Sequence, residues 1–354
     1  MKPINIRLLA WYDSHARTLP WRVSPGEGRQ GVLPDPYHVW LSEVMLQQTT
    51  VATVGPYFEK FIAKWPTVKN LAACDLEDVM KAWAGLGYYS RARNLKACAD
   101  KVASEHDGKF PQTAAELQKL PGIGPYTSAA IAAIAFGERT TVVDGNIERV
   151  STRHTANSTP LPQVKEHCRE FMDRVTPADR PGDFVQAMMD LGATICTPRN
   201  PACSLCPIND DCQGHIQQIA EQFPVKAPKK PKPTRVGAAF VAQRPDGAIW
   251  LTKRPNKGLL GGMSVVPTTG WTASKNGATG YAAAPIVGDW IPHGHIRHTF
   301  THFHLELEVW SAHVNMLPGD GWWSLQHQIG GEALPTVMKK VISAVADDLF
   351  KVPK

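Results

Sequence analysis

The chain has 354 residues, which is long enough for two domains of ordinary size. Hydrophobic residues make up 43% and charged residues 20%, as in soluble globular proteins, and no apolar run approaches the roughly 18 residues of a membrane span. The formal net charge of +6 suits a polyanionic partner but does not identify one. The N-terminus lacks the apolar core and cleavage site of a signal peptide, so we expect a cytoplasmic protein.

Residues 1–222 have the apolar spacing of helices. The first residues predict an amphipathic helix, and apolar side chains three and four apart predict further helices over 71–84, 92–104 and 114–120. Short Pro/Gly breaks separate these segments. We therefore expect an all-α first domain.

One acidic residue lies in an apolar helical segment. On a helix, Val39, Glu43 and Leu46 share one face, and a carboxyl on an apolar stripe has a raised pKa and keeps a proton near neutral pH. Alternatively, Glu43 faces solvent and Val39 lies at the edge of a core. The spacing alone leaves both interpretations open.

A glycine-rich turn joins two helices at residues 120–125. Thr113 is suited to cap the first helix, and Pro125 suits the first turn of the second. Gly122 and Gly124 leave backbone amides uncovered at a helix N-terminus, which is an arrangement that binds phosphate. The simpler interpretation is an ordinary tight turn between core helices.

An extended run at residues 140–146 stops at an acid just before another predicted helix. This position suits Asp144 as a helix N-cap, and a helix N-terminus favours the ionised form of a carboxyl there.

Four of the seven cysteines lie in one short segment: Cys196, Cys203, Cys206 and Cys212. In a reducing compartment this clustering predicts a metal site rather than disulfides. Zinc is the alternative, but zinc ribbons usually join two Cys-x2-Cys pairs, and only one such pair exists here. A local loop of four thiolates with a proline at 207 favours an iron–sulfur cluster.

The sequence changes character after residue 222. Residues 223–235 are rich in proline and lysine, which predicts an extended, semi-rigid linker. Residues 236–242 and 248–252 are short apolar runs joined by Arg-Pro-Asp-Gly, a hairpin pattern, and residues 302–309 alternate like a strand. Residues 337–349 predict a final helix, so the second domain is expected to be α+β.

Several of these motifs resemble one family. Leu-Pro-Gly-x-Gly at 120–124 with Val-Asp-Gly-Asn at 143–146 resembles the helix-hairpin-helix signature of base-excision DNA glycosylases, and the cysteine spacing is similar to the [4Fe-4S] loop of endonuclease III-like members. The segments at 42–49, 85–95 and 186–192 resemble adenine DNA glycosylases of the MutY type. These enzymes remove adenine mispaired with 8-oxoguanine.

The resemblance implies a multidomain protein. Residues 1–222 would form an all-α helix-hairpin-helix glycosylase domain, with the hairpin at 113–136 and the iron–sulfur cluster loop at 196–212. Residues 223–235 would be the linker, and residues 236–354 a Nudix-like, α+β lesion-recognition domain. One [4Fe-4S] cluster is implied as a cofactor, with the four clustered cysteines as its ligands.

The resemblance also implies site residues. Glu43 would protonate the leaving adenine and Asp144 would stabilise the positive charge on the sugar, with Tyr126 and Asn146 holding the two carboxyls. Trp21, Arg22 and Gln186 would form the adenine pocket, and Gln48, Thr49, Leu86, Tyr88, Gly122, Gly124 and Arg199 would contact DNA. Bifunctional relatives have a lysine at position 126, so a tyrosine there implies a monofunctional glycosylase.

The C-terminal domain departs from true Nudix hydrolases. Between residues 258 and 290 the only acid is Asp289, so the magnesium-binding glutamate cluster is missing, and recognition without hydrolysis is expected. The family's Phe-Ser-His loop, which reads 8-oxoguanine, is Phe300, Thr301 and His302 here. Threonine keeps the hydroxyl of the family's serine and adds a methyl group.

Two other functions remain in view. An endonuclease III-like glycosylase-lyase on oxidised pyrimidines is disfavoured by Tyr126 and the C-terminal domain, and a non-catalytic DNA-binding protein by the pairing of Glu43 with Asp144. The expected partner is double-stranded DNA containing A:8-oxoguanine or A:G mispairs, without a membrane. We expect a monomer in the cytoplasm, associated with the nucleoid in a prokaryote.

Overall fold

The structure, a computed structural model, describes residues 2–228, 231–315, 317–346 and 349–350. The chain forms two compact units. Unit 1 consists of Met1–Ala73 and Asn94–Lys229, and unit 2 of Cys74–Arg93 and Lys230–Lys354. Within the described ranges, no helix is long and apolar enough to cross a membrane.

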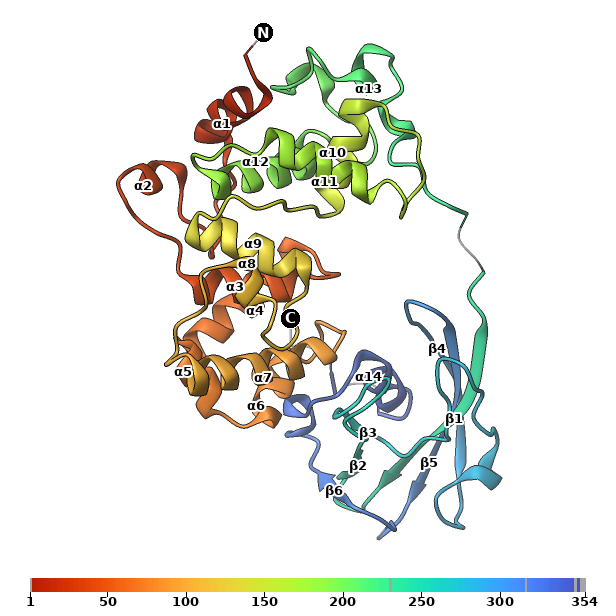
Figure 1. Ribbon diagram of the computed structural model, residues 1–354. Helices are drawn as coiled ribbons and strands as arrows, with labels where there is room; N and C mark the ends of the chain where they lie inside the picture. The colour runs from red at the N-terminus through yellow and green to blue at the C-terminus, as the bar shows by residue number, and fades with distance from the viewer. Residues whose placement is uncertain (1, 229–230, 316, 347–348, 351–354) are drawn as a thin grey trace. The chain divides into compact units, whose positions relative to one another are not determined.

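Helices build the part of the chain that precedes residue 217 (Figure 1). They are α1 (Ile4–His15), α2 (Pro25–Arg29), α3 (Pro36–Leu46), α4 (Val51–Lys64), α5 (Val68–Ala73), α6 (Leu76–Trp83), α7 (Ser90–Glu105), α8 (Ala114–Leu117), α9 (Pro125–Phe136), α10 (Gly145–Thr155), α11 (Lys165–Val175), α12 (Pro181–Thr194) and α13 (Gln213–Ile216).

One hydrophobic core of unit 1 forms where α1, α9, α10, α11 and α12 meet. Small residues let these helices approach closely. A Cβ added at Gly182 of α12 would lie 2.5 Å from the carbonyl oxygen of Ala133 in α9, and one added at Gly192 would lie 2.6 Å from the Cβ of Asn146 in α10. Helix α12 therefore packs against the start of α10, which fixes the position of Asn146.

The helical predictions are largely confirmed, with two differences. The helix expected over 92–104 lies inside α7. The single helix expected over 71–84 is wrong, because the chain forms α5 and α6 instead, and Asp75 precedes α6 in an extended conformation. The helix expected over 114–120 ends as a helix at Leu117, and the glycine turn follows.

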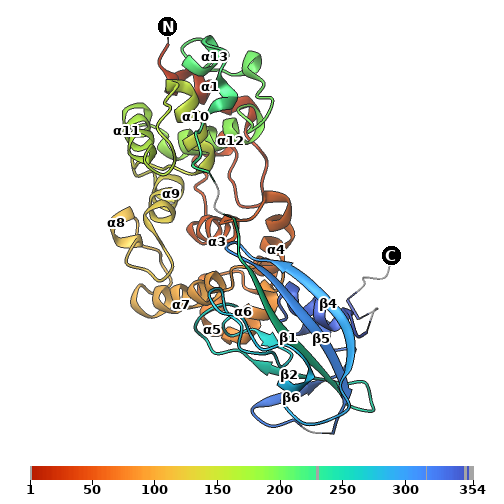
Figure 2. The ribbon, with the colours of Figure 1, turned by 90° about the vertical axis from the view of Figure 1, so that its right-hand side faces the viewer.

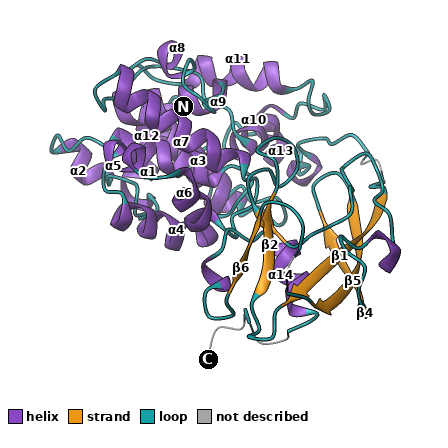
Figure 3. Ribbon diagram, turned by 90° about the horizontal axis from the view of Figure 1, so that it is seen from below, coloured by secondary structure: helices purple, strands orange, loops and turns teal. Residues whose placement is uncertain are grey.

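The described strands all belong to unit 2, where they form one mixed sheet (Figure 3). They are β1 (Thr234–Gln243), β2 (Ile249–Lys253), β3 (Ser264–Val265), β4 (Ile291–Thr299), β5 (His304–His313) and β6 (Gly321–Ser324). The order is β3-β2-β1-β5-β4, with β6 paired to β2. Strand β1 runs parallel to β5 and antiparallel to β2, and Figure 2 shows β1, β5 and β4 side by side.

Strand β1 is buried on both faces, in alternation. Ala239 and Val241 pack into a cluster with Leu307 and with Val337 and Val341 of α14 (Thr336–Ser343). Residues Ala238, Phe240 and Ala242 face the opposite side, where Trp250, Trp290 and Leu317 pack. Because successive side chains point to opposite faces of the sheet, β1 contributes to an apolar layer on each face.

The predicted fold class, a helical domain with a cluster loop followed by an α+β Nudix-like domain, is confirmed. The expected hairpin is present, because β1 pairs antiparallel with β2. The strand expected over 302–309 begins at His304, so residues 300–302 lie in the preceding loop. The helix expected over 337–349 ends at Ser343, and residues 347–348 lie outside the described part.

Candidate active site and cluster loop

Unit 1 contains a cavity of about 1080 Å³ at the end of α3. Its wall brings together residues from α3, the glycine hairpin, the start of α10 and the middle of α12. The predicted site residues that line it are Trp21, Arg22, Glu43, Gln48, Thr49, Gly122, Gly124, Tyr126, Asp144, Asn146 and Gln186. Sequence reasoning missed Arg17 and Gln47, which also line the cavity.

Glu43 is a buried acid in this cavity. Helix α3 is buried along most of its length, so Glu43 is only 7% exposed. Val39 and Leu46 line the same cavity, which confirms the helical face expected from the spacing. The Tyr126 hydroxyl donates a hydrogen bond of 2.9 Å to Glu43 Oε2. Burial raises the pKa of Glu43 to about 7, although the Tyr126 hydrogen bond and the charge of Arg22 lower it.

Asp144 is the second carboxyl, and it caps α10. Its Oδ1 accepts a 2.7 Å hydrogen bond from the Ile147 amide, and its Oδ2 accepts a 2.9 Å bond from Asn146 Nδ2. Burial raises the pKa of Asp144, while the hydrogen bonds from Ile147 and Asn146 lower it. The donors and the helix N-terminus favour its ionised form, whereas Glu43 receives a single phenol donor.

Asn146 is itself held in place. Its Oδ1 accepts a 2.9 Å hydrogen bond from Arg149 Nη2, and the same nitrogen donates to the Gly192 carbonyl at 2.5 Å. Arg149 Nε also donates to the Cys196 carbonyl at 2.7 Å. One arginine therefore ties the amide beside Asp144 to α12 and to the first cysteine of the cluster loop.

The two glycines of the hairpin occupy different structural environments. Gly122 has a φ of +74°, and a Cβ there would lie 2.6 Å from the Cβ of Asn94, so a side chain is excluded by conformation and by space. Gly124 caps α9 without any side-chain hydrogen bond, and a Cβ there would meet nothing within 4 Å. The N-terminus of α9 thus lies at the cavity edge without a capping side chain, as an anion site requires.

The segment between α3 and α4 carries the other DNA-contact predictions in this cavity. Gln48 adopts the left-handed conformation (φ 58°), which is uncommon for a residue other than glycine and concentrates at functional sites. Gln47 Nε2 donates to Thr127 Oγ1 at 3.2 Å, which ties the segment to α9. The Thr50 side chain accepts a hydrogen bond from the Thr53 amide and so caps the N-terminus of α4.

The residues expected to form the adenine pocket are largely buried. Trp21 stacks edge-on against Phe58 with ring centroids 5.2 Å apart, and Gln186 lies on α12. Arg22 has a side chain only 8% exposed, and its Nη1 donates to both oxygens of Asp190. No local pattern predicts this pairing, because the partners lie 168 positions apart.

The four clustered cysteines surround one small cavity near the end of α12. The guanidinium of Arg153, buried at 1% exposure, lines it and donates to Cys196 Sγ at 3.3 Å and to the Thr197 carbonyl at 2.7 Å. Four thiolates around a common space with a buried cation fit an anionic iron–sulfur cluster. Arg199 lies exposed on the same loop and does not line the large cavity.

A second cavity, of about 440 Å³, lies inside unit 2. Tyr88, Phe300, Thr301 and His302 line it, and the Tyr88 hydroxyl lies 2.8 Å from Thr301 Oγ1. Tyr88 is 45% exposed and has a φ of 47°, whereas Leu86 is buried at 6% exposure. The Gly-Leu-Gly-Tyr segment thus contributes to a site with the loop before β5.

Segments of this chain match three family models. Residues 41–177 match the HhH-GPD superfamily base excision DNA repair protein, residues 238–344 a NUDIX domain, and residues 196–212 the iron-sulfur binding domain of endonuclease III. The last match confirms the predicted iron–sulfur cofactor. The first places the helical part among base-excision repair proteins.

Relatives refine this classification. The adenine DNA glycosylase of Homo sapiens is 38% identical over 94% of this chain and 72% of its own length, and that of Rattus norvegicus 37% identical over 94% and 76%. A solved thermostable thymine-DNA glycosylase is 28% identical, with a TM-score of 0.53 over 60% of this chain and 95% of its own. The chain belongs to the adenine DNA glycosylase family.

Proposed function

We propose that this protein is a monofunctional DNA glycosylase that excises adenine mispaired with 8-oxoguanine or guanine. The observation that carries the proposal is the pair of unlike carboxyls in one cavity. Glu43 has its pKa raised to about 7, and Asp144 accepts two N–H hydrogen bonds at a helix N-terminus. The relatives named adenine DNA glycosylase support adenine as the base.

The two carboxyls meet the two electrostatic demands of the reaction. Adenine leaves more readily when it is protonated, and Glu43 supplies that proton while it is still the neutral acid. The sugar develops positive charge as the bond breaks, and the Asp144 carboxylate stabilises that charge. Tyr126 and Asn146 hold the two carboxyls in place through their hydrogen bonds.

Binding requires the base to leave the helix and the backbone to be held. Trp21, Arg22 and Gln186 would enclose the adenine, and the amides near Gly122 and Gly124 would bind a DNA phosphate, as would Arg199. Gln48, Thr49, Leu86 and Tyr88 would probe the opposite strand, with Tyr88 as the wedge. Phe300, Thr301 and His302 would read 8-oxoguanine.

The remaining parts of the proposal concern the cofactor and the setting. Cys196, Cys203, Cys206 and Cys212 would bind the [4Fe-4S] cluster, which shapes their loop. The protein would act as a monomer on duplex DNA in the cytoplasm, at the nucleoid if its source is a prokaryote. Residues 1–222 would be the catalytic domain, 223–235 the linker and 236–354 the lesion-recognition domain.

The test is a glycosylase assay on duplexes with adenine opposite 8-oxoguanine, guanine or thymine. We expect base release opposite the first two, and strand breaks only after alkali treatment, since Tyr126 has no amine to form a Schiff base. Borohydride should trap little protein on the DNA. Efficient trapping together with release of oxidised pyrimidines would support a glycosylase-lyase instead, and binding without any base release would support a non-catalytic protein.

Lesion recognition has its own test. Thr301→Val keeps the shape of the side chain and removes the hydroxyl that contacts Tyr88. A good base contact is worth about 1–3 kcal/mol, so the preference for 8-oxoguanine over guanine should fall by roughly one or two powers of ten. Thr252→Val in β2 is the matched control, because its hydroxyl donates to the Val265 carbonyl and Thr252 does not line this cavity. An unchanged preference in Thr301→Val would remove Thr301 from lesion recognition.

A further inference from the structure

Asp190 is a buried acid that the proposed chemistry does not use. It lies in α12 with no solvent exposure. Its carboxylate accepts four hydrogen bonds: from Arg17 Nε at 2.6 Å, from the Arg17 amide at 3.0 Å, and from Arg22 Nη1 at 2.9 and 2.8 Å. Burying a carboxylate is costly unless charged partners satisfy it, and here two guanidinium groups do so.

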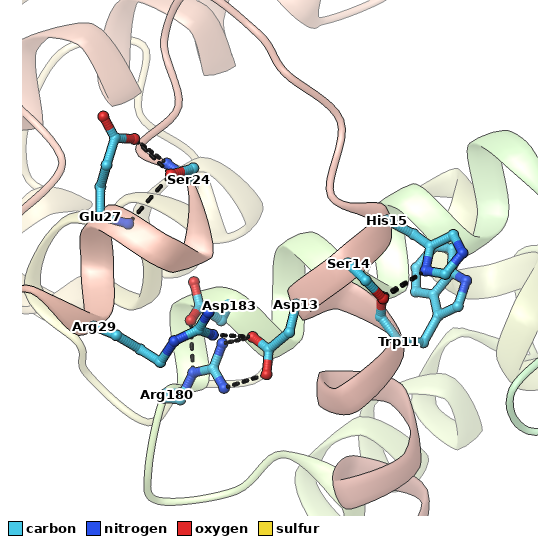
Figure 4. Close-up of polar contacts among 9 residues, drawn as sticks. All are labelled: Trp11, Asp13, Ser14, His15, Ser24, Glu27, Arg29, Arg180 and Asp183. Carbon is cyan, nitrogen blue, oxygen red and sulfur yellow. Dashed lines mark hydrogen bonds and ion pairs between the residues drawn. The ribbon is translucent and has the colours of Figure 1, made fainter.

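The segment that carries both arginines is fixed at its two ends. At the end of α1, Asp13 pairs with Arg29 of α2 at 2.7 Å and with Arg180 at 2.6 Å (Figure 4). At the start of α2, Ser24 and Glu27 form a reciprocal capping box, also drawn in Figure 4. Asp190 holds the middle of the segment, so the position of Arg22 is set by α12.

Arg22 faces the acid that the reaction needs. It lines the same cavity as Glu43, and its charge lowers the pKa of Glu43. Among the described residues that line this cavity, the carboxyl groups are Glu43 and Asp144. A guanidinium released from Asp190 would therefore meet those two carboxyls as its partners.

We propose that Asp190 is a positioning residue that holds Arg22 at the cavity wall and neutralises it, so that Glu43 is not drawn into an ion pair and remains a proton donor. This inference rests on the proposed adenine excision. In this proposal Asp190, which lies outside the cavity, keeps Glu43 as the acid.

The charges around the two groups define what a substitution would do. Glu43 is faced by Tyr126 from α9, Asp144 from the start of α10 and Arg22. Arg17 shares Asp190 with Arg22, and Tyr12 of α1 interacts with all three charges and with Asp183; burial raises the pKa of Tyr12, so it stays neutral. Asp190→Asn removes the one carboxylate that offsets both guanidinium groups.

The experiment measures single-turnover adenine excision from pH 5 to 9 in the full-length, cluster-containing protein. The rate requires neutral Glu43, so it should fall as pH rises through the pKa of that group. Asp190→Asn should move this basic limb of the pH–rate profile to lower pH by about one unit. The excision rate should then fall roughly tenfold at pH 8 and little at pH 5.5. A structural role alone would lower the rate by the same factor at every pH.

Two variants sharpen the result. Arg22→Met in the Asp190→Asn background should return the limb toward that of Arg22→Met alone, because the unbalanced charge is gone. Arg17→Gln removes the other guanidinium and leaves the Arg22 pair, so its limb should stay near the wild-type position or rise. A limb that falls in Arg17→Gln would contradict the assignment to Arg22.

The outcomes separate the two proposals. If the wild-type protein releases no adenine at any pH, the proposed function is wrong. If the wild type is active and folded Asp190→Asn has the same basic limb of the pH–rate profile, the role of Asp190 is wrong. Circular dichroism and cluster absorbance report folding. If Asp190→Asn does not fold, Arg22→Met alone decides: the limb should move to higher pH, and an unmoved limb overturns the inference.

Discussion

At the scale of single residues, the site depends on one carboxyl that is kept neutral. Glu43 is almost fully buried and has one hydrogen-bond donor, while Asp144 has two donors and a helix N-terminus. The difference between the two environments supports the proposed roles, with Glu43 as the acid and Asp144 as the charge-stabilising carboxylate. The sequence predicts both environments in outline, and the structure adds the hydrogen-bond donors Tyr126, Asn146 and Ile147.

Glu43→Gln should bind mispaired DNA and release no adenine, because an amide cannot supply the proton. The wild-type rate should be highest below pH 7 and should decrease above it, since burial raises the pKa of Glu43 to about 7 and the neutral acid is the active form. Single-turnover rates and binding by gel shift measure the two properties. A rate near that of the wild type in Glu43→Gln would mean that another group is the acid.

Tyr126→Phe should move the pH dependence in the opposite direction from Asp190→Asn. The Tyr126 hydrogen bond lowers the pKa of Glu43, so its removal should shift the basic limb of the rate to higher pH, by about half a unit. Tyr37→Phe is the control, because it loses a buried 2.8 Å hydrogen bond to the Trp65 carbonyl away from the cavity. A limb that moves equally in both variants would exclude a direct effect of the phenol.

At the scale of elements, the sequence predicted the helices and turns whose conformation depends on local patterns. The spacing of Val39, Glu43 and Leu46 placed the acid on the correct face of α3, and Leu-Pro-Gly-x-Gly located the hairpin. The interruption between α5 and α6 was missed, because apolar spacing continues across Asp75 although its backbone is extended. Strand β4, rich in histidine and beginning Ile-Pro, was also missed, since its pairing with β5 decides its conformation.

The part of the site that sequence could not predict depends on contacts distant in the chain. Arg22 reaches Asp190 and Arg149 reaches Cys196 and Gly192, and no periodicity links such positions. The motifs predict which residues react. The packing of α12 against α10 and the segment after α1 decides how those residues are held.

Gly192→Ala tests the close approach of α12 and α10. The added Cβ would lie 2.6 Å from the Cβ of Asn146, so the helices must separate or Asn146 must move. We expect unfolding to become easier by about 1–3 kcal/mol. Excision should slow by roughly one to two powers of ten, because Asn146 orients Asp144.

Gly55→Ala in α4 is the matched control, since a Cβ there meets nothing within 4 Å. It should be neutral or stabilise the protein by up to about 1 kcal/mol, the usual difference between alanine and glycine in a helix. Thermal unfolding and single-turnover rates measure both variants. Equal behaviour of the two would mean that the α12–α10 contact does not set the position of Asn146.

At the scale of the whole molecule, unit 2 is assembled from two separate pieces of chain. Residues 74–93 lie in the sequence between α5 and the glycine hairpin, yet they belong with the sheet. Lys253 pairs with Glu77 at 3.1 Å, and Arg93 donates to the Gly261 carbonyl. The Tyr88–Thr301 contact is therefore one of several that join the early piece to the late one.

As a consequence, the linker is not the only connection between the sheet and the preceding part of the chain. A protease that cuts between residues 226 and 233 would sever the backbone but leave Glu77, Tyr88 and Arg93 bound to their partners in the second fragment. The two fragments should co-elute in gel filtration after limited proteolysis and separate only in denaturant. Separation under native conditions would show that these contacts are too weak for complementation, so that covalent continuity alone retains the C-terminal fragment.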